Sequence, residues 1–196
     1  MFVSNSLLEQ VVLDLPNINL KSISSSEKKR VSILRLKGDI GHIGEIWLNH
    51  AIKVCAQKYE KIETNPINEC GKGRFYFETR KKERVDVLIR HTDMSFTDLD
   101  CVAIVDKLPT LFEINLGGNN RIKQLFESRI YKRVEAMTEY FETRDIGVVV
   151  VLQRNEFEGR SKNRYKDFKM MGGTIVPFYT DIENLKRSEN TSYRHL

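Results

Sequence analysis

Residues 98–115 read DLDCVAIVDKLPTLFEIN, and their pattern predicts how the central strands pair. Two apolar runs, 101–105 and 111–115, lie on either side of the polar dipeptide Asp106-Lys107, and both are rich in residues that favour strands. A connection this short joins antiparallel neighbours. We therefore predict that the two runs pair side by side, with the beginning of the first next to the end of the second.

The segments around this pair predict a layered structure. Residues 42–59 and 122–141 repeat apolar side chains at helical spacing. Strands are predicted at 75–77 and 85–89, as a hairpin or a bent antiparallel pair, and at 147–152 and 174–179. The order indicates an α/β protein with a central mixed β-sheet flanked by helices. We assign this core to residues 41–180, after an N-terminal extension (1–40) and before a C-terminal tail (181–196).

The composition limits the class of protein. The 196 residues include 32 Lys and Arg against 27 Asp and Glu, a net charge of +5, and 40% are hydrophobic. These values exclude a disordered or collagen-like chain. Cys55, Cys70 and Cys101 form no CxxC pair, so we expect core residues in a reducing compartment rather than a zinc site. Without a leader sequence or a long apolar run, we expect a soluble, cytoplasmic protein that does not bind membranes.

Two carboxylates are placed unfavourably for solubility. Asp100 opens one apolar strand and Glu113 interrupts the next, so the predicted pairing brings them close together. Like charges this close repel unless a cation lies between them, and Mg²⁺ is a cation that one or two carboxylates hold. Glu45 lies on the predicted helix 42–59, on the side of Leu48 and Ile52, and it could face the same sheet. The alternatives are an outward-facing Glu113 and a partly exposed Glu45.

These residues resemble the PD-(D/E)xK nuclease superfamily. Asp98-Leu99-Asp100, the following strand and turn, and Leu111-Phe112-Glu113-Ile114-Asn115 look like its core motif. Gly41-His42-Ile43-Gly44-Glu45 looks like the Gly-Glu helix motif that precedes this core in several families. The resemblance implies a restriction-endonuclease-like αβββαβ core, and it covers about residues 41–152.

The resemblance also implies roles for individual residues. Asp100 and Glu113 would be metal ligands, Ile114 would offer its backbone carbonyl, and Glu45 would be an outer or second-metal ligand. Asp98 competes with Asp100, which we prefer because the apolar strand starts immediately after it. The cofactor would be Mg²⁺, with Mn²⁺ able to substitute.

The chain departs from this motif at one position. The motif lysine lies two residues after the glutamate, where this sequence has Asn115. Asparagine can orient a water molecule but supplies no positive charge. Lys123 on the following helix or Lys107 in the turn could supply the charge instead.

Basic residues gather in two regions of the sequence that would contact nucleic acid. The first runs from Arg121 and Lys123 to Arg133, just after the glutamate strand. The second combines bases with Tyr165 and Phe168, which suits phosphate contact and stacking; its bases are Arg160, Lys162, Arg164, Lys166 and Lys169. A solvated loop is the alternative for this second cluster, and we also expect a solvated loop for the basic run 28–30.

Together these patterns predict a metal-dependent DNA endonuclease, of restriction type or resembling a junction resolvase. Both kinds usually act as dimers, because two strands must be cut, so we expect a homodimer. The alternative is a nuclease fold that has lost catalysis and kept DNA binding, which Asn115 favours. A third possibility is an interaction protein with no role in nucleic-acid binding.

Overall fold

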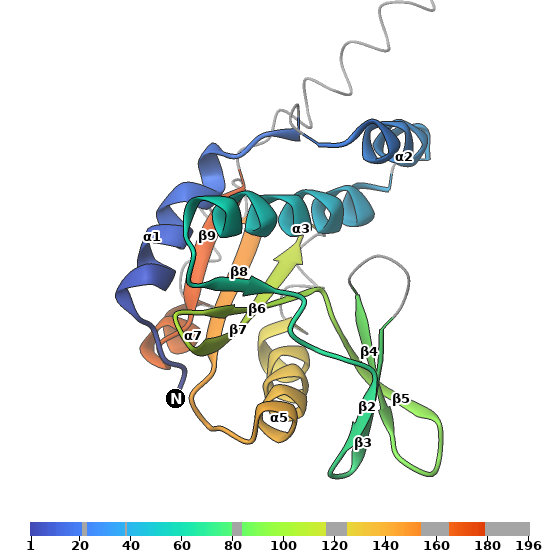
Figure 1. Ribbon diagram of the computed structural model, residues 1–196, viewed down its shortest axis with the longest axis vertical. Coiled ribbons are helices and arrows are strands. Elements are labelled where there is room, and N and C mark those ends of the chain that lie inside the picture. The colour runs from blue at the N-terminus through green and yellow to red at the C-terminus, as the bar shows by residue number, and fades with distance from the viewer. Residues whose placement is uncertain (21–22, 38, 80–83, 117–124, 154–164, 179–196) are drawn as a thin grey trace, which may run out of the picture.

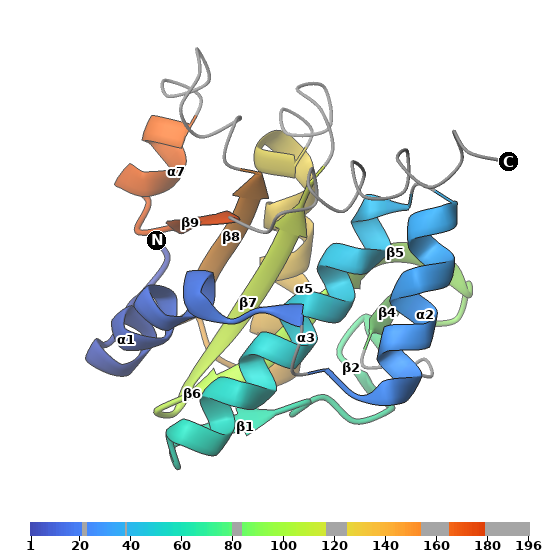
Figure 2. The same ribbon diagram turned by 90° about the horizontal axis from the view of Figure 1, so that it is seen from above.

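Two β-sheets meet near Asp100, and helices cover the larger sheet on both faces (Figures 1 and 2). The computed structural model describes residues 1–20, 23–37, 39–79, 84–116, 125–153 and 165–178. The predicted α/β class and the central mixed sheet flanked by helices are confirmed.

The larger sheet has five strands, in the order β1-β6-β7-β8-β9. β6 and β7 pair antiparallel through a two-residue turn, in which Asp106 and Lys107 have φ values of 46° and 68°. Positive φ at both central residues defines the hairpin turn that follows the natural twist of the strands. β7 then pairs in parallel with β8, and β8 in parallel with β9. The strands are β1 (Ile62–Thr64), β6 (Cys101–Val105), β7 (Leu108–Asn115), β8 (Gly147–Gln153) and β9 (Thr174–Phe178).

Alternate residues of the larger sheet face two separate hydrophobic clusters. Val149 and Val151 of β8 pack towards α1 (Ser6–Asp14) and α3 (Ile40–Lys58). Val148 and Val150 pack on the opposite face, towards α5 (Ile130–Phe141). Burial on both faces explains why this strand is apolar at every position.

The predicted hairpin forms, but in a second sheet. β3 (Phe75–Thr79) and β4 (Val85–Ile89) pair antiparallel between β2 (Cys70–Lys72) and β5 (Met94–Leu99). This four-stranded sheet lies beside the larger one, because the chain turns from β5 into β6 at Asp100 (Figure 1). The alternation of side chains predicts the pairing of the two strands but not the sheet to which they belong.

The basic run 28–30 is helical, so the predicted loop is wrong. It lies in α2 (Ser25–Leu36), whose first turn is closed by a reciprocal cap. The Glu27 backbone N–H donates to the Ser24 hydroxyl, and the Ser24 backbone N–H donates to the Glu27 carboxylate. Such a cap satisfies two backbone donors that the helix leaves unpaired.

Three other helical segments complete the described part of the chain. Pro16 lies in a 3-10 turn (Leu15–Asn17) that ends α1. A π-helical turn (Leu125–Arg129) leads into α5, and α7 (Lys166–Met170) precedes β9. None of the helices in the described part of the chain has the length and apolarity that crossing a membrane requires.

Candidate functional site

Asp100 lies where the chain passes from the smaller sheet into the larger one. It is 7% exposed, and its Oδ2 accepts a 3.3 Å hydrogen bond from the backbone N–H of Ile114 in β7. The ladder between β6 and β7 ends with Cys101 opposite Phe112. The Asp100 carboxylate therefore satisfies a backbone donor just beyond the end of that ladder. This bond holds the side chain beside β7.

Glu113 is buried on the face of β7 that α5 covers. Its neighbours Phe112 and Ile114 pack on the other face, towards α1 and α3, whereas Leu111 shares the face of Glu113. Glu113 is 3% exposed, so the alternative of an outward-facing side chain is wrong. Glu113 could reach solvent only if one face of the sheet were uncovered. Both faces of this strand are covered.

One guanidinium group joins these carboxylates. Arg133 of α5 is 3% exposed and forms an ion pair with Glu113 through Nη1. Its Nη2 lies 2.9 Å from Asp98 Oδ1 and 3.6 Å from Asp100 Oδ1. Asp100 and Glu113 thus meet as the sequence predicts, and Asp98, the competing aspartate, belongs to the same group. We call these four residues the Arg133 cluster.

The sequence grouped Arg133 with the surface bases that follow the glutamate strand. In the structure, Arg133 is buried instead. The sequence does carry a signal for its burial. It lies three residues after Ile130 and four before Met137, on the apolar stripe of α5. A base on the buried stripe of a helix indicates a buried acidic partner, because an unpaired buried charge is costly.

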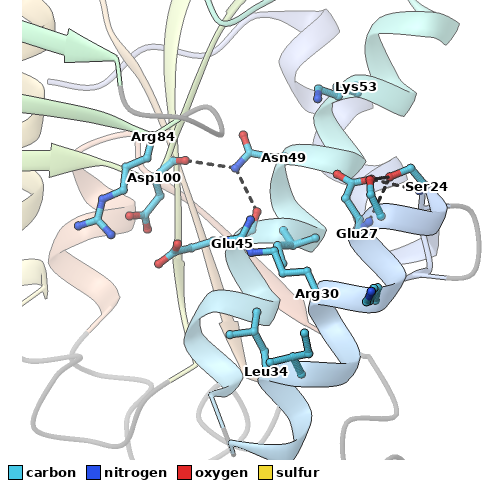
Figure 3. A pocket seen from close by; sticks show the side chains of 13 residues that line it. Ser24, Glu27, Arg30, Leu34, Glu45, Asn49, Lys53, Arg84 and Asp100 are labelled. Atoms are coloured by element: carbon cyan, nitrogen blue, oxygen red, sulfur yellow. Dashed lines mark hydrogen bonds between the residues drawn. The ribbon is translucent and has the colours of Figure 1, made fainter.

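Glu45 approaches the Arg133 cluster from α3. Asn49, one turn further along the helix, donates through Nδ2 to the Glu45 and Asp100 backbone oxygens, at 3.1 and 3.4 Å (Figure 3). Gly44 allows the helix to lie this close to β7: a Cβ there would lie 3.0 Å from Ile114 Cδ1. This contact gives a physical reason for a glycine beside the glutamate.

The group of charges around the Arg133 cluster has an excess of acids. Arg84 pairs with Asp98 and lies 3.6 Å from Asp86. The two guanidinium groups face five carboxylates, which are Glu45, Asp86, Asp98, Asp100 and Glu113. This imbalance favours the binding of a further cation.

The pKa values of the carboxyl groups follow this imbalance. Burial raises the pKa of Asp100. Burial and the nearby Asp100 charge raise the pKa of Glu45. Burial alone would also raise the pKa of Asp98, but the nearby Arg133 and Arg84 outweigh burial and lower this pKa. A cation nearby would therefore favour the ionised forms of Asp100 and Glu45.

The donors suit a divalent ion held by few protein ligands. Mg²⁺ prefers oxygen and is commonly bound through one or two carboxylates, with water and phosphate completing its shell. Within the described residues, no group of three or more His, Cys, Asp or Glu side chains is arranged to hold a metal ion. The carboxylates of Asp100 and Glu113 could therefore supply at most two protein ligands to such an ion, and water would have to complete its shell.

A cleft of about 680 Å³ between α2 and α3 reaches Glu45 and Asp100 (Figure 3), whereas Glu113 lies on the α5 face of β7 and is not part of its lining. Glu45, Asp100 and Arg84 line it at one side, and Ser24 and Glu27 line it at the start of α2. Three further bases line the cleft: Lys29 and Arg30 on α2, and Lys53 on α3. We call it the α2–α3 cleft. It combines bases that could contact phosphate with acids that could hold a metal ion.

The structure describes only some of the remaining predicted site residues. Asn115 ends β7, where it is half-buried opposite Leu152 of β8. Lys107 lies in the turn at the other end of β7, so it does not supply the missing charge. Lys166 is exposed at the start of α7. The other predicted nucleic-acid contacts lie outside the described residues: Arg121, Lys123, Arg160, Lys162 and Arg164.

The predicted stacking role of two aromatic residues is wrong. Tyr165 and Phe168 are only 2% and 6% exposed. Their rings pack against Phe126, with centroid distances of 5.4 and 4.9 Å. Tyr165 and Phe168 are therefore core residues, because the turn into the short helix α7 directs both rings inwards.

Comparison with protein-family models, with curated proteins and with solved structures finds no match to this chain. The function is therefore argued from the geometry of the Arg133 cluster and the α2–α3 cleft.

Proposed function

We propose that the protein is a metal-dependent DNA endonuclease with a restriction-endonuclease-like core. The observation that carries the proposal is the convergence of three acids from separate elements, namely Glu45 of α3, Asp100 before β6 and Glu113 of β7. The resemblance to the PD-(D/E)xK superfamily selects these same residues from the sequence. Glu45 and Asp100 line a cleft that is also lined by bases, which supports a substrate that carries phosphate.

Each part of the site has a place in phosphodiester hydrolysis. Asp100 and Glu113 would hold Mg²⁺ or Mn²⁺ directly, and Glu45 and the Ile114 carbonyl would contact the water in the shell of the ion. A bound ion of this kind lowers the pKa of a water molecule and stabilises charge on a phosphoryl oxygen. In the net reaction, water adds to phosphorus and one P–O ester bond breaks. The α2–α3 cleft would hold the DNA backbone through its bases.

A cleavage assay tests this proposal. Supercoiled plasmid and a branched DNA are incubated with the wild type and with Glu113→Gln, in Mg²⁺, Mn²⁺ or EDTA. Glu63→Gln is a matched control, because Glu63 is an exposed strand glutamate of the same sheet. The proposal predicts cleavage that requires metal, survives in the control and disappears in Glu113→Gln. The preferred DNA would separate a restriction-type enzyme from a resolvase-like one.

A nuclease fold that binds DNA without cutting it is the second candidate. Asn115 in place of the motif lysine favours it, as does the guanidinium of Arg133 among the carboxylates. This candidate predicts no cleavage with any metal, together with DNA binding that weakens steeply as salt is added. A protein without any role on DNA would show neither behaviour.

Cleavage of both strands also leads us to propose a homodimer. Two active sites related by a two-fold axis can address the two antiparallel strands of a duplex. Sedimentation of the protein with a short duplex checks this. Two chains per duplex are expected, and one chain per duplex at saturation would contradict the dimer.

A further inference from the structure

Arg133 occupies a position that stability alone does not explain. Of the basic side chains that the structure describes, Arg133 is the one that is buried. Removing a guanidinium from water is costly, and replacing such buried ion groups by apolar residues is often neutral or stabilising. A buried arginine that faces three carboxylates therefore points to a role in the function of those carboxylates.

The position of Arg133 also bears on the missing lysine of the nuclease motif. Asn115 lies two residues after Glu113 on the same strand, so it shares a face with it but carries no charge. Arg133 reaches Glu113 on this face from α5, the helix that packs over it. The positive charge is thus supplied across the helix–sheet contact rather than along the strand.

We propose that Arg133 is the positioning residue of the carboxylate site: it supplies, from α5, the charge that the motif places on lysine, and it holds Asp98, Asp100 and Glu113 towards one another. This inference rests on the proposed function. The planar, forked donors of its guanidinium fix the orientation of carboxylates.

A positioning arginine has a consequence that a purely structural arginine would not have. Arg133 and a divalent ion would both interact with the oxygens of Asp100 and Glu113. Removing the guanidinium leaves these acids with more uncompensated charge, so a divalent ion should bind more tightly. Cleavage should nevertheless become slower, because the charge and the orientation that Arg133 provides are lost. Tighter metal binding with slower cleavage is the signature of the proposed role.

The experiment compares Arg133→Met and Arg133→Lys with the wild type in the full chain. Lys61→Met is the control, since Lys61 is an exposed base that pairs with Asp106 at the turn between β6 and β7, outside the proposed site. Mn²⁺ binding is measured by calorimetry and DNA cleavage by single-turnover kinetics at several DNA concentrations. For Arg133→Met we expect Mn²⁺ to bind roughly tenfold more tightly. We expect its maximal cleavage rate to fall roughly 100-fold, with the half-saturating DNA concentration unchanged.

Three outcomes would overturn the proposal. Mn²⁺ could bind equally to Arg133→Met and the wild type, Arg133→Met could cleave as fast as the wild type, or Lys61→Met could show the same changes. If Arg133→Met does not fold, Arg133→Lys decides. It keeps the charge and should retain cleavage within roughly tenfold of the wild type. A folded, Mn²⁺-binding Arg133→Lys variant without cleavage would contradict the role.

Failure of the proposed function would be recognised separately. A wild type that neither binds Mn²⁺ nor cleaves DNA refutes the endonuclease. The inference on Arg133 then falls with it, because a positioning role requires a site that cleaves. A wild type that cleaves with metal, together with an Arg133→Met variant that binds Mn²⁺ and cleaves as the wild type does, refutes the inference on Arg133 alone.

Discussion

The Arg133 cluster and a surface pair on the α1–α3 side of the molecule are both ionic groups, but their surroundings differ. In the surface pair, Lys58 Nζ lies 2.8 Å from Asp14 Oδ2, and the two side chains are 58% and 28% exposed. In the Arg133 cluster, the Arg133 and Glu113 side chains are 3% and 4% exposed. The surface pair is balanced, one base to one acid, whereas the buried cluster has one base for three acids.

The pKa directions show what this difference means. Hydrogen bonds from Lys58 and Tyr59 lower the pKa of Asp14, as expected for a simple stabilising pair. Burial raises the pKa of Asp100. A carboxyl group that is harder to ionise than usual, at the end of a cleft, is a common mark of a functional site. The two groups therefore differ in role. The surface pair stabilises the fold, whereas we propose that the Arg133 cluster takes part in the reaction.

Removing the base should separate the two groups more strongly than any other substitution. Arg133→Met should lower the free energy of unfolding by about 3–5 kcal/mol in EDTA, because it leaves buried carboxylates uncompensated. Lys58→Met should leave the urea midpoint almost unchanged, because its pair is exposed to water. Urea denaturation at neutral pH measures both. Equal losses in the two variants would remove the distinction between the groups.

A second prediction concerns the bases of the α2–α3 cleft. The double variant Arg30→Gln, Lys53→Gln should weaken DNA binding and reduce the slope of log affinity against log salt by roughly two units. Lys61→Gln is the control, because Lys61 is exposed and pairs with Asp106 at the turn between β6 and β7. Fluorescence anisotropy at several salt concentrations gives the slopes. An unchanged slope in the double variant would place the DNA elsewhere.

A third prediction uses the raised pKa of Glu45. Its folded-state pKa lies above the ordinary value of 4.5, so ionisation of Glu45 at neutral pH destabilises the folded state. In EDTA, Glu45→Gln should therefore unfold at a higher temperature than the wild type at pH 7. The difference should shrink as the pH falls through the raised pKa towards 4.5, where both states become protonated. A less stable Glu45→Gln at pH 7 would contradict this.

The smallest expected effect is on the surface pair. The pKa of Asp14 is lowered in the folded state from its ordinary value of 3.8, so its ionised form adds stability above that value. Asp14→Asn should thus be slightly less stable at neutral pH. Its deficit should fade as the pH falls below about 3.8, the reverse of the trend for Glu45→Gln. Thermal unfolding between pH 3 and 7 measures both trends, and parallel curves would refute the contrast.

Local patterns predicted the elements that form the site. The tight turn at Asp106-Lys107 fixed the pairing of β6 with β7, and that pairing alone brings Asp100 next to Glu113. Helical spacing located α3, on which Glu45 lies. These predictions succeeded because short connections and regular periodicities restrict the chain strongly.

The predictions that failed depend on contacts between distant segments. A strand pattern does not tell which sheet a strand joins, so the second sheet was missed. The burial of Arg133 depends on three acids 20 to 35 residues earlier in the sequence, and only packing of α5 on β7 brings them together. Tyr165 and Phe168 looked like surface residues among bases, but their neighbour in the core is Phe126.

Anomalous diffraction from crystals grown with Mn²⁺ tests the proposed site most directly. We predict a manganese peak within bonding distance of the Asp100 and Glu113 carboxylates, with Arg133 moved away from at least one of them. A map without a peak at these residues at saturating Mn²⁺, with the ion pairs of Arg133 unchanged, would contradict a metal-dependent nuclease. It would support a nuclease fold in which arginine has replaced the metal.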